Sequence, residues 1–190
     1  MELHAQTTTP DLDRDLDALT QQVQRLTDQA AIRDLAALYV MAVDDHDIER
    51  VLDCFAPTGS FTRAGVKTTG HDALRAFYIA MMDRYVTTLH TPHSHVIAID
   101  DANTATGLST GHAELSLNGT LMMAAYRYSD HYARIERRWV FQDRALRFMY
   151  VTPFQDMPTT FTGPARIRWP ELPYADADIP ETSASWTTYR

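Results

Sequence analysis

The chain has 190 residues, of which 45% are hydrophobic and 22% are charged, a composition typical of a globular domain. The formal net charge of -8 argues against a nucleic-acid-binding surface, because phosphate binding depends on clustered basic side chains. The single cysteine, Cys54, excludes an internal disulfide, and no apolar run reaches the roughly 18 residues of a membrane span. The N-terminus lacks the basic start and apolar run of a secretory signal. We therefore expect a cytoplasmic protein with no nucleic-acid or membrane partner.

The N-terminal region combines a polar arm with an amphipathic helix. Residues 1–11 are polar and are predicted to be disordered. Apolar residues then recur at alternating spacings of four and three, which predicts a helix with a heptad stripe formed by Leu12, Leu16, Leu19, Val23 and Leu26. Two heptads are too short for an independent coiled coil. The stripe must therefore pack either on its own domain or on a second copy of the chain, and of these two alternatives we favour the second, in a homodimer.

Further helices and a strand are expected up to residue 86. Thr27-Asp28 predicts the N-cap of a second helix, which runs on to a polar cluster at residues 44–47. A short helix over residues 48–55 and a strand over residues 60–64 follow. Gly70 and Asp72 mark the start of another helix over residues 71–86.

From residue 90 the period of the pattern changes to two, which is typical of strands. Four long strands are predicted over residues 90–99, 104–117, 120–137 and 139–151, and Asn118-Gly119 predicts a type I′ hairpin. Helices followed by antiparallel strands indicate the α+β class, with the domain covering residues 12–153. Six of the nine prolines lie at or beyond residue 153, so residues 154–190 are predicted to be an extension that wraps the domain or a neighbouring chain.

Two clusters of titratable residues indicate where chemistry could take place. Tyr39 and the aspartates that begin at Asp44 form one, and the histidines at 90, 93 and 95 form the other. A histidine hydrogen-bonded to a carboxylate is a base poised near neutral pH, because the carboxylate fixes its tautomer and stabilises the imidazolium. Phosphate-loop, dinucleotide-binding and nucleophile-elbow motifs are absent, so no organic cofactor is expected.

The histidines also allow a metal site as an alternative. In a regular strand His90 and Ser94 face one way and His93 and His95 the other, unless Pro92 breaks the alternation. Imidazoles two residues apart share a face and could bind zinc or iron together with Asp100 or His112. No recognisable third-ligand spacing accompanies them, so no metal is assigned.

Aromatic and basic residues interrupt the predicted strands. Tyr126, Tyr128 and Tyr132 alternate onto one face, where both core packing and a pocket lined by hydroxyls explain them. Arg134 and Arg144 lie in apolar strands, where a charge is costly unless it is paired or faces a wet cavity. We expect a surface position for Arg134.

Several segments together resemble the SnoaL-like family of the NTF2-like superfamily, over about residues 25–153. In chain order they are AAIRDLAALYVMAVDDHDIERVLDCFAPTGSF, GHDALRAFY, HTPHSHVIAIDDANTATG and YSDHYARIERRWVFQDR. The first has a Tyr five residues before an Asp, and the third has a His four residues before a small polar residue. The resemblance implies a cone-shaped α+β fold, with a curved, mainly antiparallel sheet wrapped around the N-terminal helices, and a homodimer.

Dehydratases and dehydrohalogenases of this family share an Asp-His pair. By resemblance, Asp44 would orient His90, His90 would move a proton, and Tyr39 would bind or protonate a substrate oxygen. Tyr39 and Asp44 lie about 140° apart on an ideal helix, so both reach one cavity only if the helix ends or bends near Asp44. Ser94 stands where the family usually has Asn, which weakens the expectation of amide-mediated substrate binding.

These observations predict a small acid-base lyase or isomerase of the dehydratase type. Its substrate would be a hydrophobic, cyclic, oxygenated small molecule such as a steroid-like, terpenoid or polyketide intermediate, with the oxyanion met by Tyr39 or Arg144. The expected substrate-binding residues are Ser94, Tyr126, Tyr128, Arg144 and His112. The alternatives are a metal-dependent enzyme using His90, His93 or His95, and a non-catalytic ligand carrier or partner subunit. An Asp44–His90 hydrogen bond inside a pocket would favour the enzyme.

Overall fold

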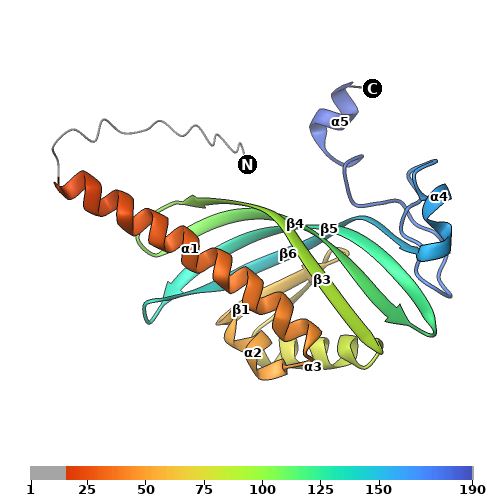
Figure 1. Cartoon of the computed structure of the whole chain (residues 1–190), viewed down its shortest axis with the longest axis horizontal. Coiled ribbons are helices and arrows are strands. Elements are labelled where there is room, and N and C mark those ends of the chain that lie inside the picture. Colours follow the sequence, from red (N-terminus) through yellow and green to blue (C-terminus); the bar gives the residue numbers. More distant parts are fainter. Residues whose placement is uncertain (1–15, 190) are drawn as a thin grey trace.

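The computed structural model describes residues 16–189 and shows a long helix lying across a curved six-stranded sheet (Figure 1). The helices are α1 (Leu16–Asp44), α2 (Ile48–Asp53), α3 (His71–Met82), α4 (Met157–Thr160) and α5 (Ala184–Tyr189), with a 3-10 turn at Phe154–Asp156. The strands are β1 (Phe55–Arg63), β2 (Val66–Thr69), β3 (Thr87–Ile99), β4 (Thr104–Leu117), β5 (Thr120–Ile135) and β6 (Arg138–Pro153). The expected disordered arm over residues 1–11 lies outside the described residues.

The strand order is β2-β1-β6-β5-β4-β3, and the only parallel pair in this sheet is β1–β6. The predicted α+β class with a mainly antiparallel sheet is therefore confirmed. Asn118 and Gly119 both have positive φ, at 50° and 74°, as a type I′ hairpin requires. The short strand β2 was not predicted. It follows a tight turn in which Ala64 and Gly65 have φ of 49° and 77°.

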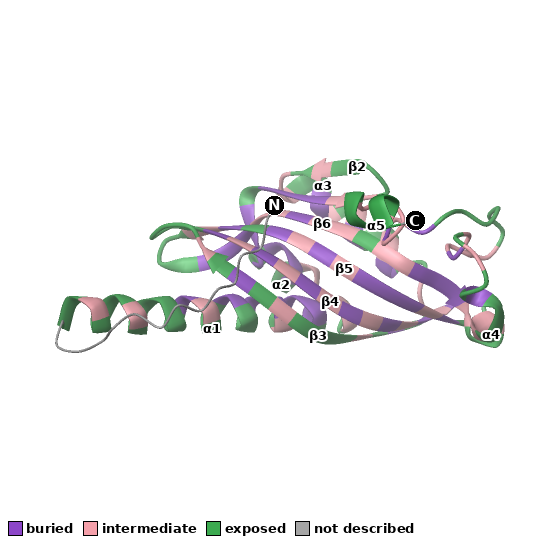
Figure 2. Ribbon diagram, turned by 90° about the horizontal axis from the view of Figure 1, so that it is seen from above, coloured by how far each residue is buried: buried purple, intermediate pink, exposed green. Residues whose placement is uncertain are grey.

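One face of the sheet is buried and the other is partly open. Along β4, buried residues alternate with half-buried ones over almost the whole strand, as Figure 2 shows. The buried face packs against α1 and the short helices, with Ile32 of α1, Val51 of α2 and Leu74 of α3 fully inaccessible to solvent. Strict alternation of this kind is what a sheet with one core face produces.

The prediction of an N-cap at Thr27-Asp28 is wrong, because α1 continues through these residues without a break. Asp28 is buried. It forms an ion pair with Arg134 and accepts a hydrogen bond from Trp139 Nε1 at 3.1 Å. The expected surface position of Arg134 is also wrong, since its guanidinium packs 4.6 Å from the Trp139 ring centre. Both corrections have one cause: a charge pair between elements more than 100 residues apart, which no local pattern reveals.

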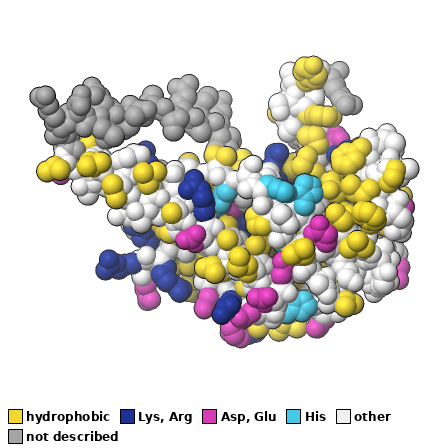
Figure 3. All heavy atoms as spheres, in the orientation of Figure 1, with side chains coloured by type: hydrophobic (Ala, Val, Ile, Leu, Met, Phe, Trp, Pro, Cys, Tyr) yellow, Lys and Arg dark blue, Asp and Glu magenta, His cyan; other side chains and the backbone are white. Residues whose placement is uncertain are grey.

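The N-terminal part of α1 extends beyond the sheet (Figure 1). The described members of the heptad stripe are exposed there, from 49% for Leu19 to 79% for Leu16. Figure 3 shows hydrophobic side chains on the surface of this segment. The stripe therefore does not pack on its own domain, and the homodimer stays a prediction. Among residues 16–189, no helix is both long enough and apolar enough to cross a membrane.

The C-terminal extension lies along β6. Ile167 pairs with Val151 of β6 on one side and with Ala175 on the other. The buried guanidinium of Arg166 holds the segment together, because it contacts both carboxylate oxygens of Glu181 at 2.7 Å and donates to the carbonyl oxygens of Met149, Gly163 and Ile179. This places the middle of the extension beside the cavity described below.

Candidate active site

The structure brings Asp44 and His90 together. Asp44 is the last residue of α1, and its Oδ1 lies 2.6 Å from His90 Nδ1 on β3. The backbone N–H of His90 donates to Asp44 Oδ2 at 2.8 Å, and the Thr88 hydroxyl donates to Oδ1 at 2.8 Å. The side chains of His90 and Asp44 are only 15% and 17% exposed. Three donors from one strand therefore hold the carboxylate in a sheltered position.

These contacts set the protonation of the pair. Burial raises the pKa of Asp44, but the hydrogen bonds from the His90 ring, the His90 backbone and Thr88 outweigh it, so the pKa lies below its ordinary value. Because an ionised carboxylate can only accept, His90 Nδ1 donates in its contact with Asp44, and in the neutral tautomer of the ring Nε2 is then the acceptor. The arrangement is that of a general base with an orienting carboxylate.

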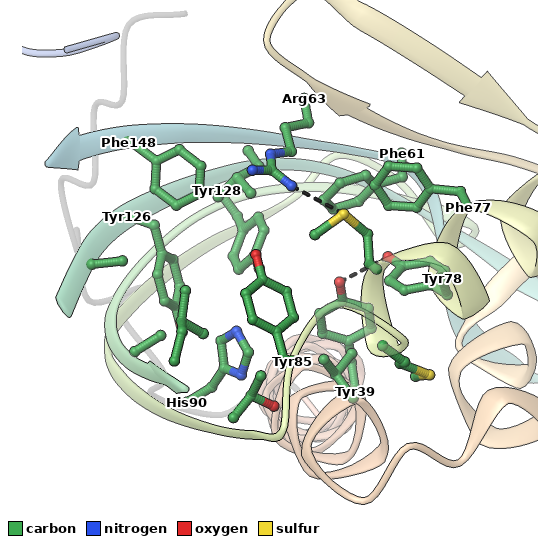
Figure 4. Close-up of a pocket in the computed structure, with 18 of the residues that line it drawn as sticks. Tyr39, Phe61, Arg63, Phe77, Tyr78, Tyr85, His90, Tyr126, Tyr128 and Phe148 are labelled. Atoms are coloured by element: carbon green, nitrogen blue, oxygen red, sulfur yellow. Dashed lines mark hydrogen bonds between the residues drawn. The ribbon is translucent and has the colours of Figure 1, made fainter. Parts of the chain in front are cut away.

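His90 lines a cavity of about 90 Å³ that is mostly apolar and aromatic (Figure 4). For comparison, an engineered cavity of about 150 Å³ holds benzene. The wall residues, besides His90, are Tyr39, Val43, His46, Phe61, Arg63, Phe77, Tyr78, Met81, Met82, Tyr85, Thr88, Ala113, Leu115, Ala124, Tyr126, Tyr128, Leu146, Phe148 and Trp169. A cavity of this volume suits a compact ligand, and a larger one must extend through its opening.

Tyr39 and Tyr78 present a pair of hydroxyls to this cavity, with their oxygens 2.8 Å apart. Burial raises the pKa of both phenols well above the ordinary value, so both are neutral. Two neutral hydroxyls in contact use one hydrogen between them and keep one to donate. The pair can therefore donate a hydrogen bond to a ligand oxygen.

The helix end explains how Tyr39 and Asp44 serve one site despite their angular separation. α1 stops at Asp44, and His46 in the following turn has φ of 56°. Tyr39 forms part of the cavity wall, whereas Asp44 is not a wall residue and holds His90 from behind. Tyr39 therefore faces the cavity directly, whereas Asp44 is linked to it through His90.

Tyr126 and Tyr128 of β5 also line the cavity. Tyr128 lies under the guanidinium of Arg144, whereas the Tyr126 hydroxyl is buried without a hydrogen-bond partner among the described residues. Burial raises the pKa of the Tyr126 phenol. Its hydroxyl occupies space that Gly111 leaves open, since a Cβ on Gly111 would lie 2.4 Å from it. An unpaired buried hydroxyl can bind a polar ligand group.

Arg144 and Ser94 do not reach the cavity that contains His90. Arg144 is 1% exposed, with its Nε 3.2 Å from Asp130 Oδ1, and its guanidinium lies 4.3 Å from the Tyr39 ring centre. Both residues line a second cavity of about 160 Å³ beside α1. The structure therefore does not support an oxyanion contact from Arg144, because its charge is paired with Asp130 behind the aromatic wall.

The histidines of β3 point in different directions. One extra residue between Pro92 and His95 shifts the pairing with β4, so His95 returns to the inner face. Its Nε2 lies 3.0 Å from the Tyr132 hydroxyl. His93 is exposed, with its Nε2 2.6 Å from Nδ1 of His112 on the outer face of the sheet. His112 thus lies away from the cavity, and in the described part of the chain no group of three His, Cys, Asp or Glu residues could hold a metal.

Four contributors to the site were not predicted from the sequence. Tyr78 looked like one member of the apolar face of α3, and Thr88 lies two residues before His90, on the same strand face. Arg63 is the last residue of β1, next to a turn that no strong sequence pattern predicts. Trp169 comes from the extension, where the proline-rich sequence has no periodicity that could place it.

Comparison with known proteins identifies relatives of the domain. Residues 24–145 match the family model described as the SnoaL-like domain. No curated protein matches the chain. A hexachlorocyclohexane dehydrochlorinase from Novosphingobium barchaimii LL02 superposes with a TM-score of 0.66 and 20% identity, over 70% of this chain and 94% of that one.

Two structures from Novosphingobium aromaticivorans are also similar. One, assigned as a scytalone dehydratase, has a TM-score of 0.66 and 18% identity, over 70% of this chain and 91% of that one. The other, an NTF2-like protein with a cystatin-like fold, has a TM-score of 0.60 and 22% identity, over 73% and 92%. At these identities the likeness shows a common fold.

Proposed function

We propose, from the premise that this chain belongs to the SnoaL-like family of the NTF2-like superfamily, that it is a small acid-base lyase or isomerase. One observation carries the proposal: Asp44 Oδ1 lies 2.6 Å from His90 Nδ1 at the wall of an apolar cavity. A carboxylate that orients an imidazole at the wall of an apolar cavity is an arrangement suited to proton transfer. A ligand carrier has no need for such a pair.

The proposed reaction begins with removal of a proton from carbon by His90 Nε2. Asp44 stabilises the imidazolium that forms, and a hydroxyl of the Tyr39–Tyr78 pair donates to the oxygen on which negative charge develops. His90 then returns its proton, either to a leaving hydroxyl, which departs as water, or to another carbon, which shifts the double bond. Neither the loss of water nor the shift of the double bond changes the overall oxidation state, so neither reaction requires an oxidant or an organic cofactor.

The shape of the cavity supports a substrate of one ring. Its walls are mainly aromatic and aliphatic side chains, and its volume of about 90 Å³ is below that of an engineered cavity that holds benzene, so even a single ring would lie partly in the opening. A steroid-like substrate would have to extend through the opening. We propose a compact, cyclic, oxygenated molecule with a carbon acid beside a carbonyl group.

The names of the similar structures support an elimination. One is called a dehydrochlorinase and another is assigned as a dehydratase, and both names describe loss of a small molecule. The metal-dependent alternative has less support, because the rings of His90, His93 and His95 have separate partners. The geometry therefore favours an enzyme that acts through Asp44 and His90.

The test is turnover of small cyclic β-hydroxy ketones, followed by the absorbance of the enone that forms on loss of water. Asp44→Asn and His90→Ala are each expected to lower kcat/KM at least about 100-fold, the usual contribution of a general base. Their melting temperatures should stay within a few degrees of wild type. His112→Ala, on the outer face, is the matched control and should keep wild-type activity. Wild-type rates in both Asp44→Asn and His90→Ala would overturn the proposal.

A further inference from the structure

Arg63 places a positive charge at the wall of the cavity, on the opposite side from His90 (Figure 4). It is the last residue of β1 and is half-buried. Its Nη1 donates to the thioether of Met81 at 3.2 Å, and it interacts with the Tyr85 hydroxyl. Burial raises the pKa of the Tyr85 phenol, so this neighbour is neutral.

No Asp or Glu within residues 16–189 lies at ion-pair distance from Arg63. Its guanidinium also lies against two aromatic rings, with the guanidinium carbon 5.6 Å from the centre of Phe148 and 5.1 Å from that of Trp169. These rings fix the orientation of the guanidinium. A guanidinium has five N–H donors, and a thioether is a weak acceptor. The Arg63 guanidinium is therefore held in a fixed orientation, and some of its N–H groups stay free to donate hydrogen bonds to a ligand.

A charge in an apolar wall is costly unless an opposite charge meets it. Each of the other charged groups near the cavity already has a partner: Asp44 is bound to His90, and Arg144 is paired with Asp130. Among the Asp, Glu, Lys and Arg side chains described near the cavity, Arg63 is the one with only neutral neighbours, and an anionic ligand would supply the opposite charge that it lacks. The planar fork of arginine fits a carboxylate, which accepts two parallel hydrogen bonds.

We propose that Arg63 and Trp169 form a carboxylate-binding subsite, and that the substrate of the proposed reaction is a compact cyclic carboxylic acid. The identity of the ligand as a substrate rests on the proposed function, whereas the subsite itself does not. Binding of the acid group at Arg63 leaves the rest of the ring to lie against the aromatic walls, toward His90. The subsite would thus orient the carbon acid for proton transfer.

The C-terminal extension contributes half of this subsite. Trp169 lies beyond residues 24–145, which match the family model, and the ion pair of Arg166 with Glu181 anchors the segment that carries it. Its indole also contacts Phe148, with ring centres 6.0 Å apart. The extension therefore contributes to ligand selection as well as covering β6.

The test compares two probes of nearly equal shape, cyclohexanecarboxylate and cyclohexanecarboxamide, in NMR titrations of the full chain at neutral pH. Wild type should bind the carboxylate at least about tenfold more tightly, as expected for a charge-assisted pair. Arg63→Met should lose that preference through weaker carboxylate binding, with amide affinity within twofold. Arg147→Met, at an exposed position of β6, is the matched control and should behave as wild type.

Further variants separate the possible outcomes. Arg63→Lys keeps the positive charge but lacks the two parallel N–H donors of the guanidinium, so it should retain part of the preference for the carboxylate. This variant tests the subsite if Arg63→Met does not fold. Asp44→Asn should lose turnover but keep the carboxylate preference, so failure of the catalytic proposal is distinguishable from failure of this one. Equal affinity of wild type for the two probes would overturn the subsite. So would a preference that survives Arg63→Met and disappears in His90→Ala, because the anion would then bind at the imidazole.

Discussion

The inner and outer faces of β3 and β4 each hold a histidine contact of 2.6 Å, and the two contacts differ in every other respect. On the inner face His90 meets the carboxylate of Asp44 in a sheltered site. On the outer face His93 meets a second imidazole, His112, in contact with solvent. The inner pair lies at the wall of the cavity and includes a carboxylate, whereas the outer pair joins two imidazoles and has no charge partner among residues 16–189, although His93 also lines the second cavity. Distance alone therefore does not make a catalytic pair.

His95 shows a third outcome on the same strand. It lies on the inner face like His90, yet its neighbours are the hydroxyl of Tyr132 and, at longer range, two arginines. Burial, reinforced by Arg144 and Arg33, lowers its pKa to about 4. His90 and His95 thus share a face and differ in partner, because only His90 meets a carboxylate.

The largest effect on stability is expected at the glycine that makes room on the inner face. Gly111→Ala would bring a Cβ within 2.4 Å of the Tyr126 hydroxyl and 2.5 Å of its ring, and a buried ring cannot move freely. We expect a loss of about 1–3 kcal/mol in the free energy of unfolding, measured by urea denaturation. Thr106→Ala, on the outer face of β4, should change it by less than about 0.5 kcal/mol. Equal effects at the two positions would contradict the contrast between the faces.

A smaller effect on the free energy of unfolding is expected from protonation of His95 at low pH. Its folded pKa lies below that of an unfolded histidine, near 6.5, so the unfolded chain binds the proton first as the pH falls. Stability that is complete above pH 6.5 should therefore decline between pH 6.5 and 4. His95→Gln should lessen the loss between pH 7 and 5 by about 1 kcal/mol, after allowance for partial exposure. Parallel pH curves of unfolding free energy for wild type and variant would refute the assignment.

The smallest effect belongs to the outer pair. His93→Ala and His112→Ala should each change the free energy of unfolding by less than about 0.5 kcal/mol, because the contact is open to water. The double variant should equal the sum of the singles, since an exposed contact adds little coupling. A clear non-additive term in this cycle would show that the outer pair is a structural element after all.

Much of this molecule follows from local sequence. The Asn118-Gly119 hairpin and β4 follow from turn chemistry and from alternation on a sheet with one core face, both of which are local properties. The resemblance carried by Tyr39, Asp44 and His90 was sufficient to propose an acid-base pair. The hairpin and the strand depend on local spacing along the chain, whereas the acid-base pair was proposed from the resemblance to the family.

Only the tertiary structure decided which of these groups meet. Asp28, within the continuous helix α1, forms a buried charge pair with Arg134 of β5, and the extra residue in β3 returns His95 to the inner face. The pairing of Arg144 with Asp130 removes one expected ligand contact, and the anchored extension brings Trp169 to Arg63. Each of these depends on contacts between segments far apart in the chain, whose energies come from burial and charge pairing in the folded state.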